Sequence, residues 1–443
     1  MAATSRLRFA LRRCHLGLQM RGLATAEQTG QLSRTSAASL QEATQSAPSS
    51  SGGSPLPPHL QAIVDAYDAK AQERALPALL DNNRAGPIGC AIAMAIAYLL
   101  HNVDDSNTTL HRVLWPTLLE RRDPEGQKQL ILRAADSRWL PMDYDKDDPY
   151  HIVVTPSGLQ FNNPIGLAAG LDTEGVGPVA FFCTGFGSME VGPVNADSAE
   201  ELQRFKTRLA GIDRTGATTP SGGLTVEMQL ARLGRLGAAV EGSLPNMLKS
   251  VKPLSPYLDY ISLTVPANLD ISSEAVLRDF VQKATLLADG GAHIFLRVCL
   301  QDCSDASVAR LQGIAAAALS SDAAGLLLSA TNCTKQVDVV RDLKRVVHRV
   351  YEGTEGSLPI LVAADARTAR EVIELVEAGA IGVQISGALL KEGPYCCRRL
   401  KYEVQGMLRS EAYATLQDAI GRDYRAAKKA RRPKNPWARM RGS

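Results

Sequence analysis

The sequence predicts an α/β protein built around a closed (β/α)8 barrel, because short apolar strands alternate with helical segments from residue 150 onward. Candidate strands cover 163–168, 187–192, 208–213, 236–241, 258–265, 293–299, 324–329, 358–363 and 381–386. Candidate helices cover 222–235, 273–289, 304–320, 335–351, 366–378 and 389–410. Eight or nine such strands are accounted for most simply by a closed barrel, and a doubly wound open sheet is the alternative.

The composition agrees with this fold class. Apolar residues make up 45% of the 443 residues and aromatic residues only 5%, which is typical of a helix-rich α/β protein. The eight cysteines show no CxxC spacing, so neither a disulfide framework nor a metal site is expected.

The first 28 residues predict a mitochondrial presequence. They carry five arginines and no acidic residue before Glu27, with leucine and phenylalanine between the arginines, as in a basic amphipathic targeting helix. Residues 29–57 are rich in Ser, Gln, Ala and Pro, and we expect them to form a disordered linker.

Residues 58–105 predict a helix followed by a membrane span. The run 85–103, AGPIGCAIAMAIAYLLHNV, contains no Asp, Glu, Lys or Arg. As a helix it would be about 28 Å long, close to the thickness of a hydrocarbon core. The prediction is one span of the mitochondrial inner membrane. Because Ala and Gly dominate the run, a buried helix is the alternative.

Residues 106–149 predict two amphipathic helices that separate at Asp123-Pro124, since proline begins a helix more readily than it continues one. An apolar face either caps the following domain or enters a bilayer interface. That face consists of Val113, Leu114, Leu118 and Leu119.

The C-terminal segment, 413–443, is strongly basic. From Arg422 to Ser443 it has nine Lys or Arg residues and one Asp, against a net charge of +3 for the whole chain. Such a segment suits an acidic protein groove, an anionic lipid such as cardiolipin, or ribosomal RNA, and a solvated chain end is the plain alternative.

Several motifs, in order along the chain, resemble the membrane-attached, quinone-using class 2 dihydroorotate dehydrogenases. They are LWPTLLERRDPEGQKQLILRAADSRWLP, GLQFNNPIGLAAGLDTEG, TGFGSMEVGPV, LDYISLTVPAN, AGLLLSATN, EAGAIGVQISGALLKEGP and LQDAIGRDYR. The resemblance covers about residues 85 to 424. It implies a quinone-tunnel-like helix pair at 106–149 and a barrel at 150–412. In that family flavin mononucleotide (FMN) lies over the barrel mouth, a serine takes a proton from dihydroorotate, and quinone reoxidises the flavin.

The resemblance also exposes departures at the flavin positions. Ala168, Ala169 and Gly170 match the flavin-contacting turn, but the lysine of that turn is Thr173 here. The lysine expected on a later flavin-binding strand is Arg297. Arginine keeps the charge but changes the shape of the group.

The phosphate-binding positions depart further. The family pattern Gly-Val-Gly-Gly aligns with Val362-Ala363-Ala364-Asp365, so side chains crowd the approach and Asp365 brings a negative charge. Ser386 and Gly387, which match a second phosphate contact, remain permissive.

On the substrate side, the family pattern Asn-Arg-Tyr-Gly-Phe-Asn begins here with Asp213 and Arg214. The pattern Asn-Val-Ser-Ser-Pro-Asn becomes the shorter run from Thr264 to Asn268, and Ala267 occupies the position of the base. Loss of a positioned base lowers a rate by about 10²–10⁴. Ser262 would need a register change to replace it.

The sequence therefore predicts a pseudoenzyme of the mitochondrial inner membrane with no catalytic residue and no bound FMN. Its role would be that of an accessory subunit, in a respiratory-chain complex first or a mitochondrial ribosome second. One alternative is an active FMN-dependent dihydroorotate dehydrogenase (quinone) of de novo pyrimidine (UMP) biosynthesis. Another is a barrel that binds a different small anion through Arg214 and Arg297. Asp172, Asp213 and Asp365 are also open to interpretation as solvated turn formers or helix N-caps.

Overall fold

The structure, a computed structural model, describes residues 109–143, 149–212, 234–267, 274–330 and 339–431. The segments predicted as a presequence, a linker and a membrane span lie outside these residues, as does most of the helix predicted at 222–235. Of the helices within them, none has the length and apolar character needed to cross a bilayer.

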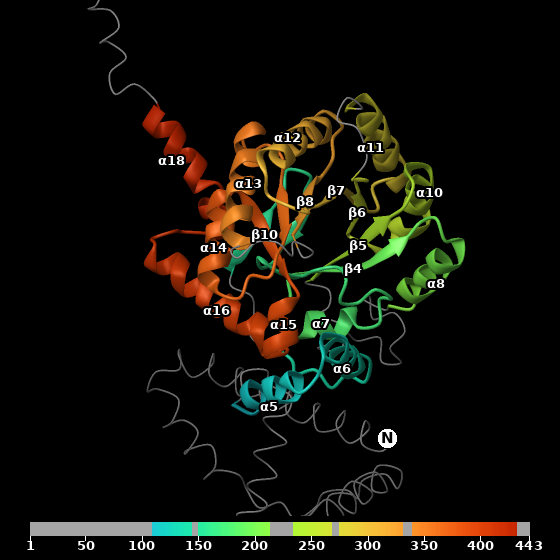
Figure 1. The fold of residues 1–443 in the computed structure, drawn as a ribbon, viewed down its shortest axis with the longest axis vertical. Helices are drawn as coiled ribbons and strands as arrows, with labels where there is room; N and C mark the ends of the chain where they lie inside the picture. Colours follow the sequence, from blue (N-terminus) through green and yellow to red (C-terminus); the bar gives the residue numbers. More distant parts are fainter. Residues whose placement is uncertain (1–108, 144–148, 213–233, 268–273, 331–338, 432–443) are drawn as a thin grey trace, which may run out of the picture. The chain divides into compact units, whose positions relative to one another are not determined.

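Eight parallel strands close into a barrel, which confirms the predicted fold class (Figure 1). Around the barrel the order is β10-β3-β4-β5-β6-β7-β8-β9. The last strand pairs with the first, Val383 opposite Ile165, so the sheet has no open edge and is not doubly wound. The strands are β3 (Ile165–Leu167), β4 (Ser188–Asn195), β5 (Arg235–Glu241), β6 (Tyr260–Thr264), β7 (His293–Cys299), β8 (Gly325–Ser329), β9 (Ile360–Ala363) and β10 (Ala380–Ile385).

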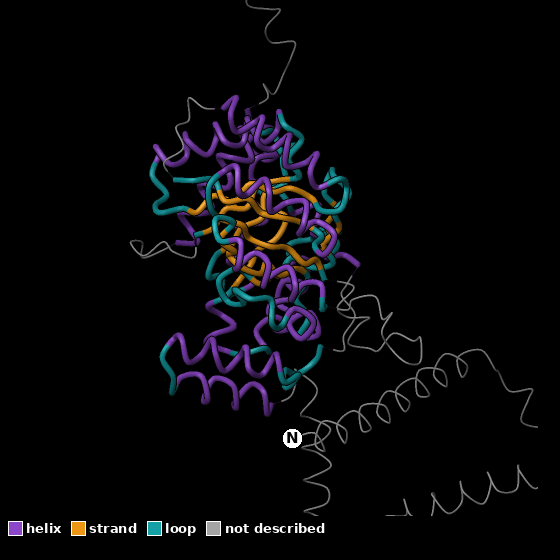
Figure 2. Tube along the Cα trace, turned by 90° about the vertical axis from the view of Figure 1, so that its right-hand side faces the viewer, coloured by secondary structure: helices purple, strands orange, loops and turns teal. Residues whose placement is uncertain are grey.

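Helices surround the strands (Figure 2), and an antiparallel pair, β1 (Val153–Val154) with β2 (Gln160–Phe161), precedes the barrel. The helices that alternate with the strands or follow them are α7 (Pro178–Cys183), α8 (Ala199–Ala210), α10 (Leu244–Leu254), α11 (Glu274–Ala288), α12 (Asp305–Ser320), α13 (Val339–Gly353), α14 (Ala369–Ala378), α15 (Gly387–Glu392), α16 (Tyr395–Ser410), α17 (Leu416–Ala419) and α18 (Arg422–Arg431). Two 3₁₀ turns are η1 (Pro149–His151) and η2 (Ser255–Tyr257).

The strand predicted at 208–213 is wrong, because residues up to 210 belong to α8. Ser198 begins that helix by accepting a hydrogen bond from the Glu201 amide. Phe205 and Leu209 lie on one buried face, four residues apart as helical periodicity requires. The run at the end of α8 resembles a short strand when taken alone, because Phe205, which shares its buried helical face, lies upstream of it.

Within the part of the chain that the structure describes, two helices precede the barrel, and they separate where the sequence predicts. α5 (Thr109–Glu120) ends before Asp123, and α6 (Pro124–Asp136) begins with proline at its first position. Within the predicted apolar face, Leu119 is fully buried, whereas Val113 is 62% and Leu114 41% exposed. One residue of the predicted face therefore packs into the protein, and the others face outward.

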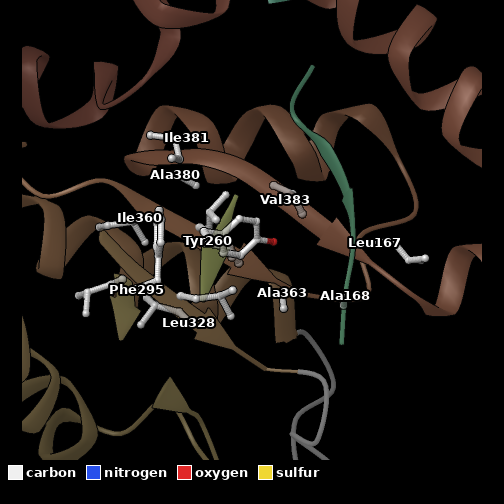
Figure 3. Packing of buried hydrophobic residues seen from close by; sticks show 14 of the residues in the cluster. Leu167, Ala168, Tyr260, Phe295, Leu328, Ile360, Ala363, Ala380, Ile381 and Val383 are labelled. Atoms are coloured by element: carbon white, nitrogen blue, oxygen red, sulfur yellow. The ribbon is translucent and has the colours of Figure 1, made fainter. Parts of the chain in front are cut away.

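Tyr260 and Phe295 lie among aliphatic side chains in the buried core of the barrel (Figure 3). Tyr260 is fully buried, and its ring meets Phe295 edge-on with centroids 5.4 Å apart. Gln384 donates a hydrogen bond of 2.9 Å to its hydroxyl. Gly237, on the neighbouring strand, leaves room for this ring, because a Cβ there would overlap it. Only glycine allows the tyrosine to pack at this level.

We expect Gly237→Ala to destabilise the protein by about 1–3 kcal/mol, because the new methyl group forces Tyr260 from its rotamer. Chemical unfolding followed by circular dichroism measures the change. Gly406→Ala is the matched control: no atom lies within 4 Å of its added Cβ, so it should stabilise helix α16 by about 0.5–1 kcal/mol. Equal stability of the two variants would contradict the role given to Gly237.

Candidate functional site

The carboxyl ends of the barrel strands bring together most of the predicted site residues. Ala168 follows β3, Thr264 ends β6, Ala364 follows β9 and Ser386 follows β10. Arg297 lies within β7. The same end of a (β/α)8 barrel carries the chemistry of enzymes with this fold. Asp213, Arg214 and Asn268 lie outside the described residues.

The turn after β3 is fixed by backbone hydrogen bonds. The Gly170 amide donates to the Gly192 carbonyl at 2.7 Å, and the Gly192 amide donates to the Asp172 carbonyl at 3.0 Å. The Asp172 carboxylate accepts from the amides of Val176 and Gly177, both at 2.9 Å. At 1% exposed, Asp172 is a turn former but not a solvated one. Burial raises the pKa of Asp172, and the backbone amides that donate hydrogen bonds to its carboxylate oppose this rise.

Around this turn, some of the residues aligned with the family's flavin contacts are buried and others are exposed. Ala168 and Ala169 are buried, so they shape the top of the barrel wall. Thr173, at the position of the family's lysine, is exposed. Its neighbour Glu174 pairs with Arg208 at 2.7 Å. The ion pair formed by this turn therefore joins it to helix α8.

A polar layer crosses the barrel above Tyr260, and Glu190 is the member of it that the sequence motifs did not indicate. Glu190 on β4 is fully buried and accepts a short hydrogen bond from the Ser262 hydroxyl. Burial raises the pKa of Glu190, although Arg297 and the Ser262 hydroxyl act against the rise. The available signal was an acidic residue inside the apolar run SMEVGPV, since a carboxyl group in a strand buried on both faces needs an internal partner.

Arg297 lies in the same interior and is only 5% exposed. Its Nε and Nη1 atoms have no hydrogen-bond partner within the described residues, and neither does the Thr264 hydroxyl. The two residues are opposite one another in the β6–β7 pairing. They form a polar surface that lacks part of its hydrogen bonding.

At the base position, the described structure offers no proton acceptor from a side chain. Ala267 is exposed, and Arg310 donates a hydrogen bond of 2.7 Å to the carbonyl of the preceding Pro266. The Ser262 hydroxyl is buried and engaged with Glu190. Reaching the barrel mouth would require Ser262 to leave that contact.

At the phosphate end, Asp365 lies against Gly387. A Cβ built on Gly387 would overlap the Asp365 carboxylate, so this carboxylate fills the space beside the glycine. Arg367 pairs with the same carboxylate, with 2.7 Å between Nη2 and Oδ2. Ala364 is fully buried below the pair. Asp365 is thus part of an ion pair rather than a helix N-cap.

These contacts test whether the residues present fit the FMN that the resemblance implies. A phosphate dianion beside Gly387 would meet the Asp365 carboxylate at close range. Like charges about 4 Å apart repel by about 1 kcal/mol in water and about 4 kcal/mol near a protein surface. The phosphate end does not fit the group as it stands.

A separate groove of about 500 Å3 lies on the outer surface between α12 and α13. Its lining is mainly apolar and includes Ala315, Leu319 and Val350. It contains no titratable side chain, so it offers no chemistry.

Comparisons with known proteins give consistent similarities in sequence, although no protein-family model matches the chain. The chain is 27% identical over 363 residues to a Rhodospirillum rubrum protein named dihydroorotate dehydrogenase (quinone), covering 72% of this chain and 96% of that one. A Cereibacter sphaeroides protein of the same name is 29% identical over 341 residues, covering 69% and 95%. The mitochondrial protein of that name from Mus musculus is 27% identical over 367 residues, covering 70% and 90%.

Solved structures support the fold. A DHODH from Eimeria tenella, in complex with ferulenol, superposes with a TM-score of 0.57 at 21% identity, covering 69% of this chain and 96% of that one. Together these similarities define the class of fold as an α/β barrel like that of the Eimeria tenella DHODH. More particularly, the chain is a distant homologue of the quinone-type, class 2 dihydroorotate dehydrogenases.

The buried Glu190 gives a pH prediction. Its folded-state pKa is raised above the ordinary value of 4.5, so its contribution to stability is fully present below that pH. The contribution is lost as the pH rises through the folded-state pKa, with a slope of at most about 1.4 kcal/mol per pH unit. Glu190→Gln keeps an acceptor for Ser262 and removes this loss, so the variant gains stability relative to the wild type as the pH rises.

Urea unfolding from pH 4 to 8 measures the difference between the two proteins. Glu274→Gln, which changes an exposed carboxyl group on α11, is the matched control and should not reproduce the trend. Parallel stability curves for wild type and Glu190→Gln would contradict the prediction.

Proposed function

We propose that the chain is a pseudoenzyme of the dihydroorotate dehydrogenase type, whose barrel serves as a structural element. The observation that carries the proposal is the position of the Asp365 carboxylate beside Gly387. The family binds the flavin phosphate at the matching place. A carboxylate held there by Arg367 opposes a phosphate dianion by charge and by volume.

The substrate side supports the same proposal. Ala267 replaces the base, and the Ser262 hydroxyl is engaged with Glu190. Proton abstraction from dihydroorotate needs a basic atom within hydrogen-bond reach of the substrate. The side chain at the base position, Ala267, supplies none.

We further propose that the protein is an accessory subunit of a larger assembly at the mitochondrial inner membrane, a respiratory-chain complex first and a mitochondrial ribosome second. The presequence composition supports the mitochondrion, and the relatives from Mus musculus and Oryza sativa are named mitochondrial. The outward-facing Val113, Leu114 and Leu118 of α5 support contact with a partner or a membrane, because clustered exposed apolar side chains favour burial.

The basic C-terminal segment supplies a second contact. Helix α18 is attached to the barrel through Tyr424, which meets Tyr351 with ring centroids 5.8 Å apart, and through Arg431, 2.9 Å from Glu352. Lys428 and Lys429 are exposed. The attachment presents a positive charge at a fixed place, which suits an acidic protein, an anionic lipid or ribosomal RNA.

A second function is an active, FMN-dependent dihydroorotate dehydrogenase (quinone) of pyrimidine biosynthesis. The comparisons favour it more directly than the pseudoenzyme, because the relatives that bear this name match over nearly their whole length. It requires Asp365 to move when flavin binds, and a proton acceptor other than the Ala267 side chain.

The absorbance spectrum of the purified protein distinguishes the two functions. For the pseudoenzyme we expect no flavin band, no gain of one after incubation with excess FMN, and no orotate when dihydroorotate and a quinone are added. A stoichiometric flavin band together with orotate formation would establish the enzyme instead.

The carboxylate itself can be tested by Asp365→Gly. Removing it should strengthen FMN binding by about fivefold or more, because the repulsion of about 1–4 kcal/mol between neighbouring like charges is relieved. Quenching of FMN fluorescence on titration measures the affinity. Asp322→Gly, at an exposed position with φ of 56°, is the matched control and should leave the affinity unchanged. If Asp365→Gly binds FMN no better than the wild type, Asp365 is not the obstacle.

A further inference from the structure

Helices α13 and α18 lie against one another on the outside of the barrel (Figure 1). Besides the contact between the Tyr351 and Tyr424 rings, Lys344 of α13 pairs with Asp423 of α18, with 3.4 Å between Nζ and Oδ2. The two helices carry nine Lys or Arg residues and only three Asp or Glu. They therefore form one surface with an excess of positive charge, the α13–α18 surface.

The carboxylates of this region are shared among several cations. Arg349 and Arg431 both pair with Glu352, at 3.7 and 2.9 Å. Lys428 pairs with Glu355, which follows α13, at 3.2 Å. The three cationic side chains are 51–72% exposed, and exposed pairs of this kind contribute only about 0–1 kcal/mol each. Such pairs hold α18 in place and leave its cations accessible to an anion from outside.

Three further cations of the surface are exposed and have no carboxylate partner within the described residues: Arg345, Arg425 and Lys429. Arg345 donates a hydrogen bond of 3.0 Å to the carbonyl of Cys303. Arg425 donates to the carbonyls of Ile420 and Asp418. A carbonyl fixes the direction of a guanidinium group without neutralising its charge, and the remaining N–H groups stay available. These arginines are therefore oriented cations that still lack an anion.

The α13–α18 surface offers no large apolar side chain to a partner. Among the described residues, the exposed large hydrophobic side chains all lie on other elements. Protein interfaces are anchored by aromatic and apolar residues that become buried, and a helix that lies in a membrane interface needs an apolar face. Interfaces with nucleic acids are more polar and much more positively charged. The composition of this surface fits a nucleic acid best.

We propose that the α13–α18 surface binds the phosphodiester backbone of a nucleic acid without reading its sequence. The guanidinium groups of Arg345 and Arg425 match pairs of phosphate oxygens, and Lys429 supplies a point charge. Phosphate contacts give affinity and position but carry no sequence information. The inference rests on the partner contact proposed above for the basic C-terminal segment and names its partner class. It does not depend on whether the barrel is a pseudoenzyme.

Fluorescence anisotropy of labelled oligonucleotides, titrated with the full chain, tests the proposal. The probes are a short duplex RNA, a duplex RNA of unrelated sequence, and the duplex DNA that corresponds to the first. We expect similar affinities for the two RNAs, falling steeply as salt rises from about 50 to 200 mM. Tighter binding of RNA than of DNA identifies RNA as the source of the phosphates, and the reverse order identifies DNA. No binding at low salt, or a strong preference between the two RNA sequences, would overturn the proposal.

A double variant, Arg345→Gln with Lys429→Gln, locates the site. Loss of two phosphate contacts should weaken binding at low salt by about tenfold or more, and should lower the slope of log K against log salt by about 1–2. Lys249→Gln with Lys252→Gln is the matched control, because it removes two exposed charges from α10. It should bind as the wild type does. Circular dichroism establishes that both variants are folded, and equal affinities of the two would refute the assignment.

Two further probes represent the other partner classes. Vesicles that contain cardiolipin represent an anionic lipid, and polyglutamate represents an acidic protein. Binding of either that is tighter than that of the nucleic acids, and is lost in Arg345→Gln with Lys429→Gln, would overturn the nucleic-acid assignment. Failure here is distinct from failure of the pseudoenzyme proposal, which the flavin band and orotate formation decide.

Discussion

The pairing of β10 with β3 closes the sheet, and the rest of the structure depends on that closure. Val383, Gln384 and Ile385 lie opposite Ile165, Gly166 and Leu167. Closure removes the free edges of the sheet, and it creates an interior that side chains must fill. It also brings the ends of strands more than two hundred residues apart to one mouth. The candidate flavin and substrate positions within the described residues lie in that interior or at that mouth.

The interior is filled in two levels with different chemistry. At the lower level the rings of Tyr260 and Phe295 pack against each other, and Gly237, which has no side chain, leaves space for the tyrosine ring. Above them lie Glu190, Ser262 and Arg297, buried polar groups that stabilise a fold only where they are paired. Glu190 accepts from Ser262 through one carboxylate oxygen, whereas its other oxygen and two nitrogens of Arg297 have no partner within the described residues. The upper level is thus the part of the barrel that is least complete without a ligand or water.

The homology and the site chemistry lead to different expectations about activity, and the reason lies in where sequence change has occurred. Identity of 27–29% to quinone-type dihydroorotate dehydrogenases preserves the barrel, because apolar alternation and small residues at close approaches are enough to maintain it. The groups that touch a flavin or a substrate are few. At several of those positions this chain makes an internal contact instead, as Asp365 does with Arg367.

The sequence by itself determined the barrel, the break between α5 and α6 at Asp123-Pro124, and all eight barrel strands. The ninth candidate strand, 208–213, is instead the end of α8. Local periodicity decides such elements. The role of Asp172 as a buried turn former, the Glu190–Ser262 contact and the carboxylate beside Gly387 were decided by tertiary structure alone. Each joins residues from separate strands or loops, or depends on burial that only the closed barrel creates. A sequence pattern records which groups are present, but the distances between those groups arise only when β10 meets β3.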